Sequence, residues 1–228
     1  GYNTAVGYQA GVGVTTGIQN TLMGGLSGAA LTTGQRNVAV GYAALQLEDA
    51  HGFNTALGYA TLNALNAGAD AYNTAVGYNA GFSMTTGINN TLIGGLAGDA
   101  LTTGTNNVAL GQGALTATTT AANNIAIGVS ALGANVLGAS SVAIGLQSLA
   151  QQLPSSGTLM HNVCVGQKTG FAVTTGVQNT LIGGLAGDAI DTGDNNIIIG
   201  YNAAASAVGV NNETVIGTAT TTNAIVYG

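Results

Sequence analysis

Apolar and polar positions alternate along this chain in short runs, and the runs return at a fixed interval. A pentamer of the form Asn-Thr-Ala-Val-Gly, first seen at 3–7, recurs with variations thirteen times. The pentamers start at Asn3, Asn20, Asn37, Asn54, Asn73, Asn90, Asn107, Asn124, Ser141, Asn162, Asn179, Asn196 and Glu213. Ten of the twelve intervals are 17 residues, and the others are 19 and 21. Such a period is typical of stacked repeats and predicts an elongated solenoid of about 13 coils.

The three residues between the Asn and the Gly of each pentamer predict a short strand. The first is mostly β-branched and the third is a sizeable apolar residue, and both lie on one face of a strand. The period of two over short runs favours strand over helix. We expect this face to form the core, with the third-position residues at its centre. The core residues expected on this basis are Val6, Val40, Val76, Ile93, Ile127, Ile144 and Ile182.

The middle residue of each pentamer is apolar as well. It is mostly Ala, with variants such as Leu22, Leu92, Cys164 and Leu181. A strand that is apolar on both faces is usually covered on both. One coil covers one face by folding back on itself, and the simplest cover for the other face is a second copy of the chain. The pattern therefore predicts a homo-oligomer.

A second segment completes each coil after the pentamer. A small residue stands three positions after the Gly, as at Ala10, Ala44 and Ala80, which indicates a close backbone approach. A further glycine closes many coils, as at Gly17 and Gly34, and suits a tight turn. We expect two short strands and two turns per coil. Thirteen coils stacked about 4.8 Å apart would form an all-β rod of roughly 60 Å.

Two insertions interrupt the 17-residue period, at 67–71 and 153–160. Insertions in solenoids map to turns, so both are expected to be surface loops. Residues 1–228 are then a single repetitive domain. The chain starts inside one repeat and stops abruptly, so we expect it to be a segment of a longer fibre.

The Asn that opens most pentamers has a structural explanation. In a stack, like residues lie above like, and Asn carries both donors and an acceptor. We therefore expect a structural ladder of asparagines along the axis. Its members are Asn3, Asn20, Asn37, Asn54, Asn73, Asn90, Asn107, Asn124, Asn162, Asn179 and Asn196.

Composition narrows the range of functions. Only 4% of residues are charged but 46% are hydrophobic, which is unlike a disordered chain. The net charge is −6, with Arg36 and Lys168 as the only Lys or Arg residues. This balance argues against nucleic acid and against an anionic membrane surface as partners. The uncharged stretch 125–150 is broken by glycine and serine at the repeat interval, so we expect no membrane insertion in this segment.

The sequence contains few candidate catalytic residues. His51 and His161 stand in loop-like positions between repeats and are interpreted as exposed loop residues. No paired carboxylates, Cys/His metal spacing or phosphate-binding loop accompany them, so we expect no enzyme, no catalytic residues and no cofactor. Cys164 is the only cysteine, and its simplest interpretation is a small buried apolar residue.

Asp188, Asp191 and Asp194 form the one acidic cluster of the sequence. Oxygen ligands at a turn suit Ca²⁺, and turn-capping aspartates are the alternative.

Two repeated residue types indicate further surfaces. Threonine pairs begin at Thr15, Thr32, Thr85, Thr102 and Thr174, where a flat array would bind ice, although the column is interrupted. Tyrosines follow the pentamer glycine at Tyr8, Tyr42, Tyr59, Tyr78 and Tyr201. They would either stack on glycan rings or pack over the neighbouring coil.

The motifs Asn-Thr-Ala-Val-Gly-Tyr-Gln-Ala-Gly at 3–11, Asn-Val-Ala-Val-Gly-Tyr-Ala-Ala-Leu at 37–45 and Ser-Ser-Val-Ala-Ile-Gly at 140–145 resemble the head repeats of trimeric autotransporter adhesins. Similar repeats occur in phage tail fibres. The resemblance covers essentially the whole chain, although the usual adhesin-head repeat is shorter. Residues 218–228 look like the closing coil that precedes a chaperone domain in such fibres.

The resemblance implies a left-handed parallel β-roll in a side-by-side homotrimer. It implies a surface fibre, extracellular or on a virion, that attaches to a host-cell glycan or protein receptor. The few charges and the missing stalk favour a phage tail fibre over the head of a bacterial adhesin. A monomeric ice-binding or glycan-binding solenoid is the alternative of a different class.

Overall fold

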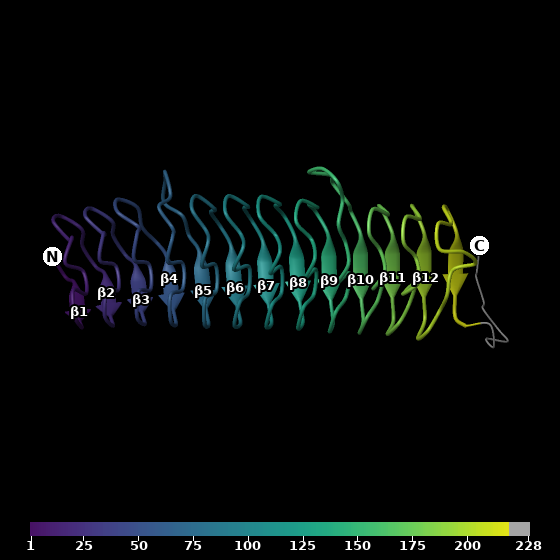
Figure 1. Ribbon diagram of the computed structural model, residues 1–228, viewed down its shortest axis with the longest axis horizontal. Helices are drawn as coiled ribbons and strands as arrows, with labels where there is room; N and C mark the ends of the chain where they lie inside the picture. Colours follow the sequence, from purple (N-terminus) through teal and green to yellow (C-terminus); the bar gives the residue numbers. More distant parts are fainter. Residues whose placement is uncertain (219–228) are drawn as a thin grey trace.

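A computed structural model describes residues 1–218, in which every regular element is a β-strand. The thirteen strands form one parallel sheet in chain order, so the chain is a parallel β-solenoid of about 13 turns (Figure 1). Each strand spans the three residues between the ends of a pentamer. The strands are β1 (Thr4–Val6), β2 (Thr21–Met23), β3 (Val38–Val40), β4 (Thr55–Leu57), β5 (Thr74–Val76), β6 (Thr91–Ile93), β7 (Val108–Leu110), β8 (Ile125–Ile127), β9 (Val142–Ile144), β10 (Val163–Val165), β11 (Thr180–Ile182), β12 (Ile197–Ile199) and β13 (Thr214–Ile216). The closing coil expected at 218–228 lies almost wholly outside the described residues.

The pairing register follows the pentamer even where the period changes. Ala75 of β5 pairs with Leu92 of β6 across a 17-residue interval. Ala56 pairs with Ala75, and Ala143 with Cys164, across the two longer coils. The extra residues therefore leave the sheet undisturbed. Figure 1 shows them as two loops that project from the body near β4 and between β9 and β10.

The two inserts are anchored at their ends and exposed between them. Ala67 and Ala71 are buried, whereas residues 68–70 are exposed. In the second insert Pro154 and Met160 are buried, whereas residues 155–157 are exposed.

The core lies on the opposite side of the sheet from the expected one. The middle residue of every strand from β2 to β12 is fully buried: Leu22, Ala39, Ala56, Ala75, Leu92, Ala109, Ala126, Ala143, Cys164, Leu181 and Ile198. The expected core residues lie on the outer face instead. Val6 and Ile182 are 56% and 39% exposed, and the other five (Val40, Val76, Ile93, Ile127, Ile144) are half-buried.

The prediction of these seven residues as core is therefore wrong for the single chain, and the reason is geometric. Side chains alternate between the two faces of a strand, so the middle residue points to the opposite face from the first and third. Here the middle residue points inward and is buried, and the other two point outward.

The small middle residue fits because a second residue fills the same space. Where the middle residue is Leu, glycine stands four positions after the pentamer glycine, as in Leu92 with Gly98. Where the middle residue is Ala, leucine stands there in five of seven coils, as in Ala109 with Leu115, and glycine stands there in the coils of Ala5 and Ala75. A Cβ at Gly98 would lie 2.9 Å from Leu92 Cδ2, so the two positions share one volume. Most coils thus contribute one leucine to a close-packed core, either from the middle of the strand or from the segment that follows it.

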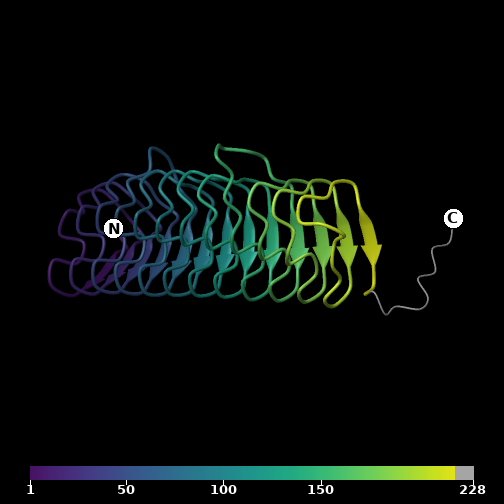
Figure 2. The same cartoon turned by 45° about the vertical axis from the view of Figure 1, so that its right-hand side comes forward.

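The second segment of each coil is not a strand, contrary to the expectation of two strands per coil. Two of its residues have left-handed backbone, as at Ala43 (φ 54°) and Leu45 (φ 51°). Such residues interrupt an extended chain. Hydrogen bonds between coils still continue, since Gly28 N–H donates to Ala44 O (2.9 Å) and Leu45 N–H to Thr61 O (3.0 Å). Figure 2 shows the strands along one side of the roll and these turns on the other.

The pentamer glycine is required by the stacking of coils. Gly41 has φ 137°, and a Cβ there would lie 2.2 Å from the Gly58 carbonyl oxygen of the next coil. Any side chain at this column would separate neighbouring coils.

Candidate functional site

The outer face of the sheet is an apolar surface that runs along the described chain. It consists of the first and third residues of the strands, which point away from the core. Its most exposed members are Val6, Met23, Val38, Leu57, Leu110, Ile125, Val163, Ile182, Ile197 and Ile216. Extended apolar patches on soluble proteins mark interaction sites.

This outer face differs between the two halves of the roll. The first residue of the strand is Thr in five of the strands β1–β6, but Val or Ile in five of the strands β7–β12. Branched aliphatic side chains at both outward positions, such as Ile125 with Ile127, make the C-terminal half the more apolar one. The outer apolar face is therefore strongest over β7–β12.

Three of the five tyrosines considered as glycan-stacking residues form a column. The rings of Tyr42 and Tyr59 are stacked with centroids 5.5 Å apart at 19°, and Tyr59 stacks on Tyr78 at 5.5 Å and 15°. All three are half-exposed or more. Tyr8 and Tyr201 are also exposed but lie in other coils, outside this stack. The structure brings together a triplet and not a continuous strip.

The triplet is bounded by glycines at both ends. A Cβ at Gly25 would lie 3.3 Å from Tyr42 Cδ2, so the ring of Tyr42 covers the preceding coil. A Cβ at Gly95, in the coil after Tyr78, would meet no atom within 4 Å. The far face of Tyr78 is therefore open, while the inner rings pack over neighbouring coils.

A second aromatic column precedes the same strands, β3–β5. Phe53 stacks on Tyr72 with centroids 4.9 Å apart at 18°, and the Arg36 guanidinium lies 5.3 Å from the Phe53 centroid. These residues immediately precede the pentamer Asn, where the backbone is left-handed in most coils. Sequence reasoning missed this column, although the three residues stand at one repeat position. Strands β4 and β5 are thus flanked by aromatic rings on both sides, whereas β3 is preceded by Arg36.

The asparagines form a ladder along the roll. Asn107 shows the pattern: its Oδ1 accepts the Asn124 N–H (3.0 Å), and its Nδ2 donates to Asn90 Oδ1 (3.1 Å) and to Ala121 O (2.9 Å). Asn20 through Asn196 are at most 1% exposed. The ladder satisfies buried backbone groups at the turn before each strand, and its function is structural.

Ser141 is the one interior break in this ladder, and a glutamine repairs it. Gln152 points inward, and its Oε1 accepts from Ser141 Oγ (3.1 Å) and from Asn162 Nδ2 (3.0 Å). Its Nε2 donates to Asn135 Oδ1 (3.3 Å). This polar network lies next to the second insert.

The threonine pairs divide between two roles. The first Thr of a pair donates its hydroxyl to the next coil, as Thr32 does to Asp49 O (2.9 Å) and Thr102 to Thr119 O (3.0 Å). The second Thr of each pair is exposed, as at Thr33 and Thr103. The exposed hydroxyls therefore form a single row along the roll, which is interrupted where a coil lacks the threonine pair.

The acidic cluster near the C-terminus does not converge on a common point. Asp194 Oδ1 accepts the Val177 N–H (2.8 Å), and an Asp191 carboxylate oxygen accepts the Thr174 hydroxyl. Within the described ranges, the three carboxylates of Asp188, Asp191 and Asp194 do not come together as a set of metal ligands. Asp194 instead binds a backbone N–H of the preceding coil and Asp191 binds a threonine hydroxyl of that coil, so both link neighbouring coils.

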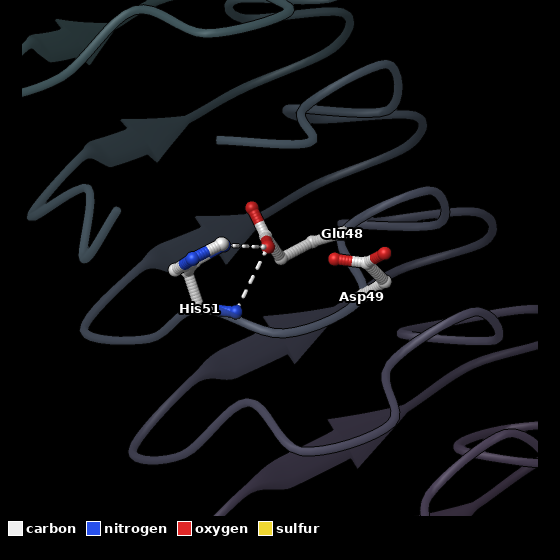
Figure 3. Close-up of side chains that lie close together, drawn as sticks. All are labelled: Glu48, Asp49 and His51. Atoms are coloured by element: carbon white, nitrogen blue, oxygen red, sulfur yellow. Dashed lines mark hydrogen bonds and ion pairs between the residues drawn. The ribbon is translucent and has the colours of Figure 1, made fainter. Parts of the chain in front are cut away.

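A different cluster does converge, in the coil of β3. Ligand atoms of Glu48, Asp49 and His51 all lie within 4.8 Å of one another, and Figure 3 shows the His51 ring facing Glu48. His51 is half-buried, so its interpretation as an exposed loop residue is wrong. The repeat pattern does not predict this cluster, because Glu48 occupies a position that is apolar in most coils, such as Leu31 and Leu65.

Glu48 is fully buried and its carboxylate is held by two backbone groups. Oε1 accepts the His51 N–H and Oε2 accepts the Ala67 N–H, both at 3.1 Å. Burial raises the pKa of Glu48, and the two backbone hydrogen bonds oppose that rise. The Ala67 N–H belongs to the first insert, so Glu48 ties the insert to the preceding coil.

Cys164 and His161 take no part in a cluster. Cys164 is fully buried as the middle residue of β10, and burial raises the pKa of its thiol. His161 is exposed in the turn before β10.

A comparison of the chain with protein-family models, with curated proteins and with solved structures finds no match. In residues 1–218 no helix has the length and apolar character needed to cross a membrane. The function must therefore be argued from the surfaces described above.

Proposed function

We propose that this chain is a structural segment of a trimeric surface fibre that mediates attachment, as in a phage tail fibre. The head of a bacterial adhesin is the closest alternative. The observation that carries this proposal is the outer apolar face, which runs the length of the sheet. In the proposed assembly the rolls are left-handed and stand side by side, each placing this face against its neighbours.

The size of the face supports a second copy as its cover. Thirteen strands about 4.8 Å apart, each three residues long at about 3.3 Å per residue, give roughly 600 Å². Stable interfaces bury about 800 Å² per partner, so side chains at the edges of the sheet would complete an interface of this size. A like partner presents a strip with the same repeat, and three copies that turn this strip toward a common axis would each contact the other two.

The proposal is tested by the mass of the protein in solution. Light scattering after size-exclusion chromatography should give about three times the chain mass of 22.1 kDa. Ile127→Asp, on the outer face, should yield monomers. Thr103→Asp adds the same charge at an exposed turn and should leave the trimer intact. A wild-type chain that stays monomeric at micromolar concentration contradicts the assembly.

Glycan binding is a second candidate, because the column Tyr42–Tyr59–Tyr78 leaves one ring face open over Gly95. Aromatic faces stack on the apolar faces of sugars, and a surface with so few charges suits a neutral glycan. Binding to a glycan array should be lost in Tyr78→Ala and kept in Tyr201→Ala. Equal binding by both variants would contradict a site at the triplet.

A further inference from the structure

The coil of β3 carries a carboxylate where the roll elsewhere places neutral side chains. Glu48 belongs to an inward column whose described members also include Leu31, Leu65, Met84 and Leu101, and it is as fully buried as they are. An ionised carboxylate removed from water is costly unless an opposite charge or hydrogen bonds compensate it. Its two backbone hydrogen bonds leave the charge itself unbalanced.

The protein offers little positive charge to balance it. Arg36 donates from Nε to Gln19 Oε1 (3.0 Å) and stacks on Phe53, and the Lys168 ammonium lies over Phe171. The one ion pair found in residues 1–218 is His51 with Glu48. Meanwhile Asp49 adjoins Glu48, and an Asp70 carboxylate oxygen accepts the Gly52 N–H (3.1 Å). Two carboxylates, Glu48 and Asp49, thus lie close to one imidazole at the base of the first insert, and Asp70 adds a third at the neighbouring backbone of Gly52.

The imidazole is placed as a ligand would be. His51 Nδ1 is closed off from solvent, has no hydrogen-bond partner, and lies 3.5 Å from Glu48 Oε1. Because Nδ1 faces a carboxylate oxygen, the contact is attractive only when a proton or a metal cation lies between the two atoms. Two ligands of a tetrahedral ion with bonds of about 2.0 Å are separated by about 3.3 Å. The observed separation is close to this value before any metal is added.

We propose that Glu48, Asp49 and His51 bind one divalent transition-metal ion, of the Zn²⁺ class, at the base of the first insert. One imidazole with two carboxylates suits Zn²⁺ or Mn²⁺, whereas Ca²⁺ and Mg²⁺ prefer oxygen ligands alone. Asp49 completes the set, since one of its carboxylate oxygens lies within 4.8 Å of the ligand atoms of Glu48 and His51. Since Glu48 also accepts the Ala67 N–H, the ion would fix the insert to the body of the roll.

The test is calorimetric titration of the full chain with Zn²⁺, together with the absorption spectrum of added Co²⁺. One ion should bind per chain, and the ion should raise the thermal midpoint. Glu48→Gln keeps both the volume and an acceptor oxygen, and His51→Gln removes the imidazole. Each should weaken Zn²⁺ binding by about tenfold or more. His161→Asn removes the other histidine and should change nothing.

Asp49→Asn provides a third variant in case Glu48→Gln disturbs the fold, which circular dichroism without metal would reveal. Loss of binding in the three cluster variants, with retention in His161→Asn, supports the site. Two outcomes overturn it: no saturable 1:1 binding by the wild type, or binding that His51→Gln leaves unchanged. In either case a proton held between His51 and Glu48 accounts for the pair.

Discussion

The two faces of the thirteen-stranded sheet are built from neighbouring residues of the same strands, yet they differ in how many side chains they carry and how deeply these are buried. The inner face receives one residue per strand, and its volume is shared with the second segment of the coil, as in Leu92 with Gly98. The outer face presents two residues per strand, and within residues 1–218 all of them are half-buried or exposed. The more hydrophobic residues, Val and Ile, stand mostly outside. In this narrow roll the inner face selects for side-chain size, whereas the outer face leaves Val and Ile half-buried or exposed.

The largest effect should come from a charge on the inner face. Leu92→Asp would place an unpaired carboxylate in the closed core and should destabilise the roll by at least about 3 kcal/mol. Urea denaturation followed by circular dichroism measures this. A variant that unfolds at the wild-type urea concentration would show that the inner face is open to water.

Removal of side-chain volume from the inner face should lower the stability less than a buried charge does. A larger side chain on the opposite segment of the same coil should restore most of the lost stability. Leu92→Ala should lose about 2–5 kcal/mol. Adding Gly98→Leu recreates the arrangement of Ala109 with Leu115, whose backbone is the same at φ 56° and 55°. The double variant should recover most of the loss in a double-mutant cycle. A double variant no more stable than Leu92→Ala would contradict the shared volume.

The ladder beside the inner face should contribute a smaller amount. Asn107→Ala leaves the Asn124 N–H and the Ala121 carbonyl oxygen without their partner, and we expect a loss of about 2–3 kcal/mol. Thr103→Ala, at an exposed turn of the same coil region, is the control and should change stability by less than about 0.5 kcal/mol. Equal losses of stability in the two variants would contradict a specific contribution of the ladder.

A charge on the outer face should barely affect the single chain. Ile93→Asp lies next to Leu92 but points outward, so its carboxylate stays in water. We expect a change below about 1 kcal/mol in the monomer's free energy of unfolding, and loss of the oligomer. Light scattering and urea denaturation on one sample separate the two effects. Unfolding as severe as that of Leu92→Asp would mean that the two faces are not distinct.

The smallest effect on stability should come from substitutions that only move a thiol between the two faces. The rate at which the thiol reacts then measures how accessible each face is. Cys164 should resist a disulfide reagent at pH 8 until the roll unfolds, because burial raises the pKa of its thiol and blocks access. Val163→Cys, in a Cys164→Ala background, places the thiol on the outer face. It should react rapidly whenever the oligomer is diluted to monomers. Fast reaction of native Cys164 would contradict the closed inner face.

Much of this fold follows from the sequence because the repeat leaves few alternatives. The 17-residue period fixes the number of turns, and the pentamer fixes each strand to within its three residues. The asparagine column follows from stacking like on like. These features depend on local spacing alone, which a single sequence contains in full.

The assignment of faces did not follow, because hydrophobicity and burial diverge here. Val and Ile at the outward positions are more apolar than Ala at the inward one, so ranking by hydrophobicity selects the wrong face. A useful signal was the reciprocal pairing of Leu with Gly, since Leu22 with Gly28 and Ala39 with Leu45 conserve volume between coils. The left-handed turns were also foreshadowed by Asn before the pentamer Asn, as at Asn89 and Asn106.

The Glu48 cluster could not be predicted from the sequence for a different reason. Its geometry depends on a turn conformation and on contact with the next coil, where the Ala67 N–H meets the Glu48 carboxylate. Neither is encoded in the spacing of residues 48–51.

The direction of the strand ladder has a mechanical consequence. The strands lie across the long axis, so their hydrogen bonds run along it (Figure 1). Tension applied to the two ends of one roll would therefore load the coils in series, and the force at rupture would be that of the weakest coil. Coils would then peel away singly, each releasing 17 or more residues of slack. Rolls bound side by side would carry the same tension in parallel, which gives a fibre under load a reason to be built from several chains.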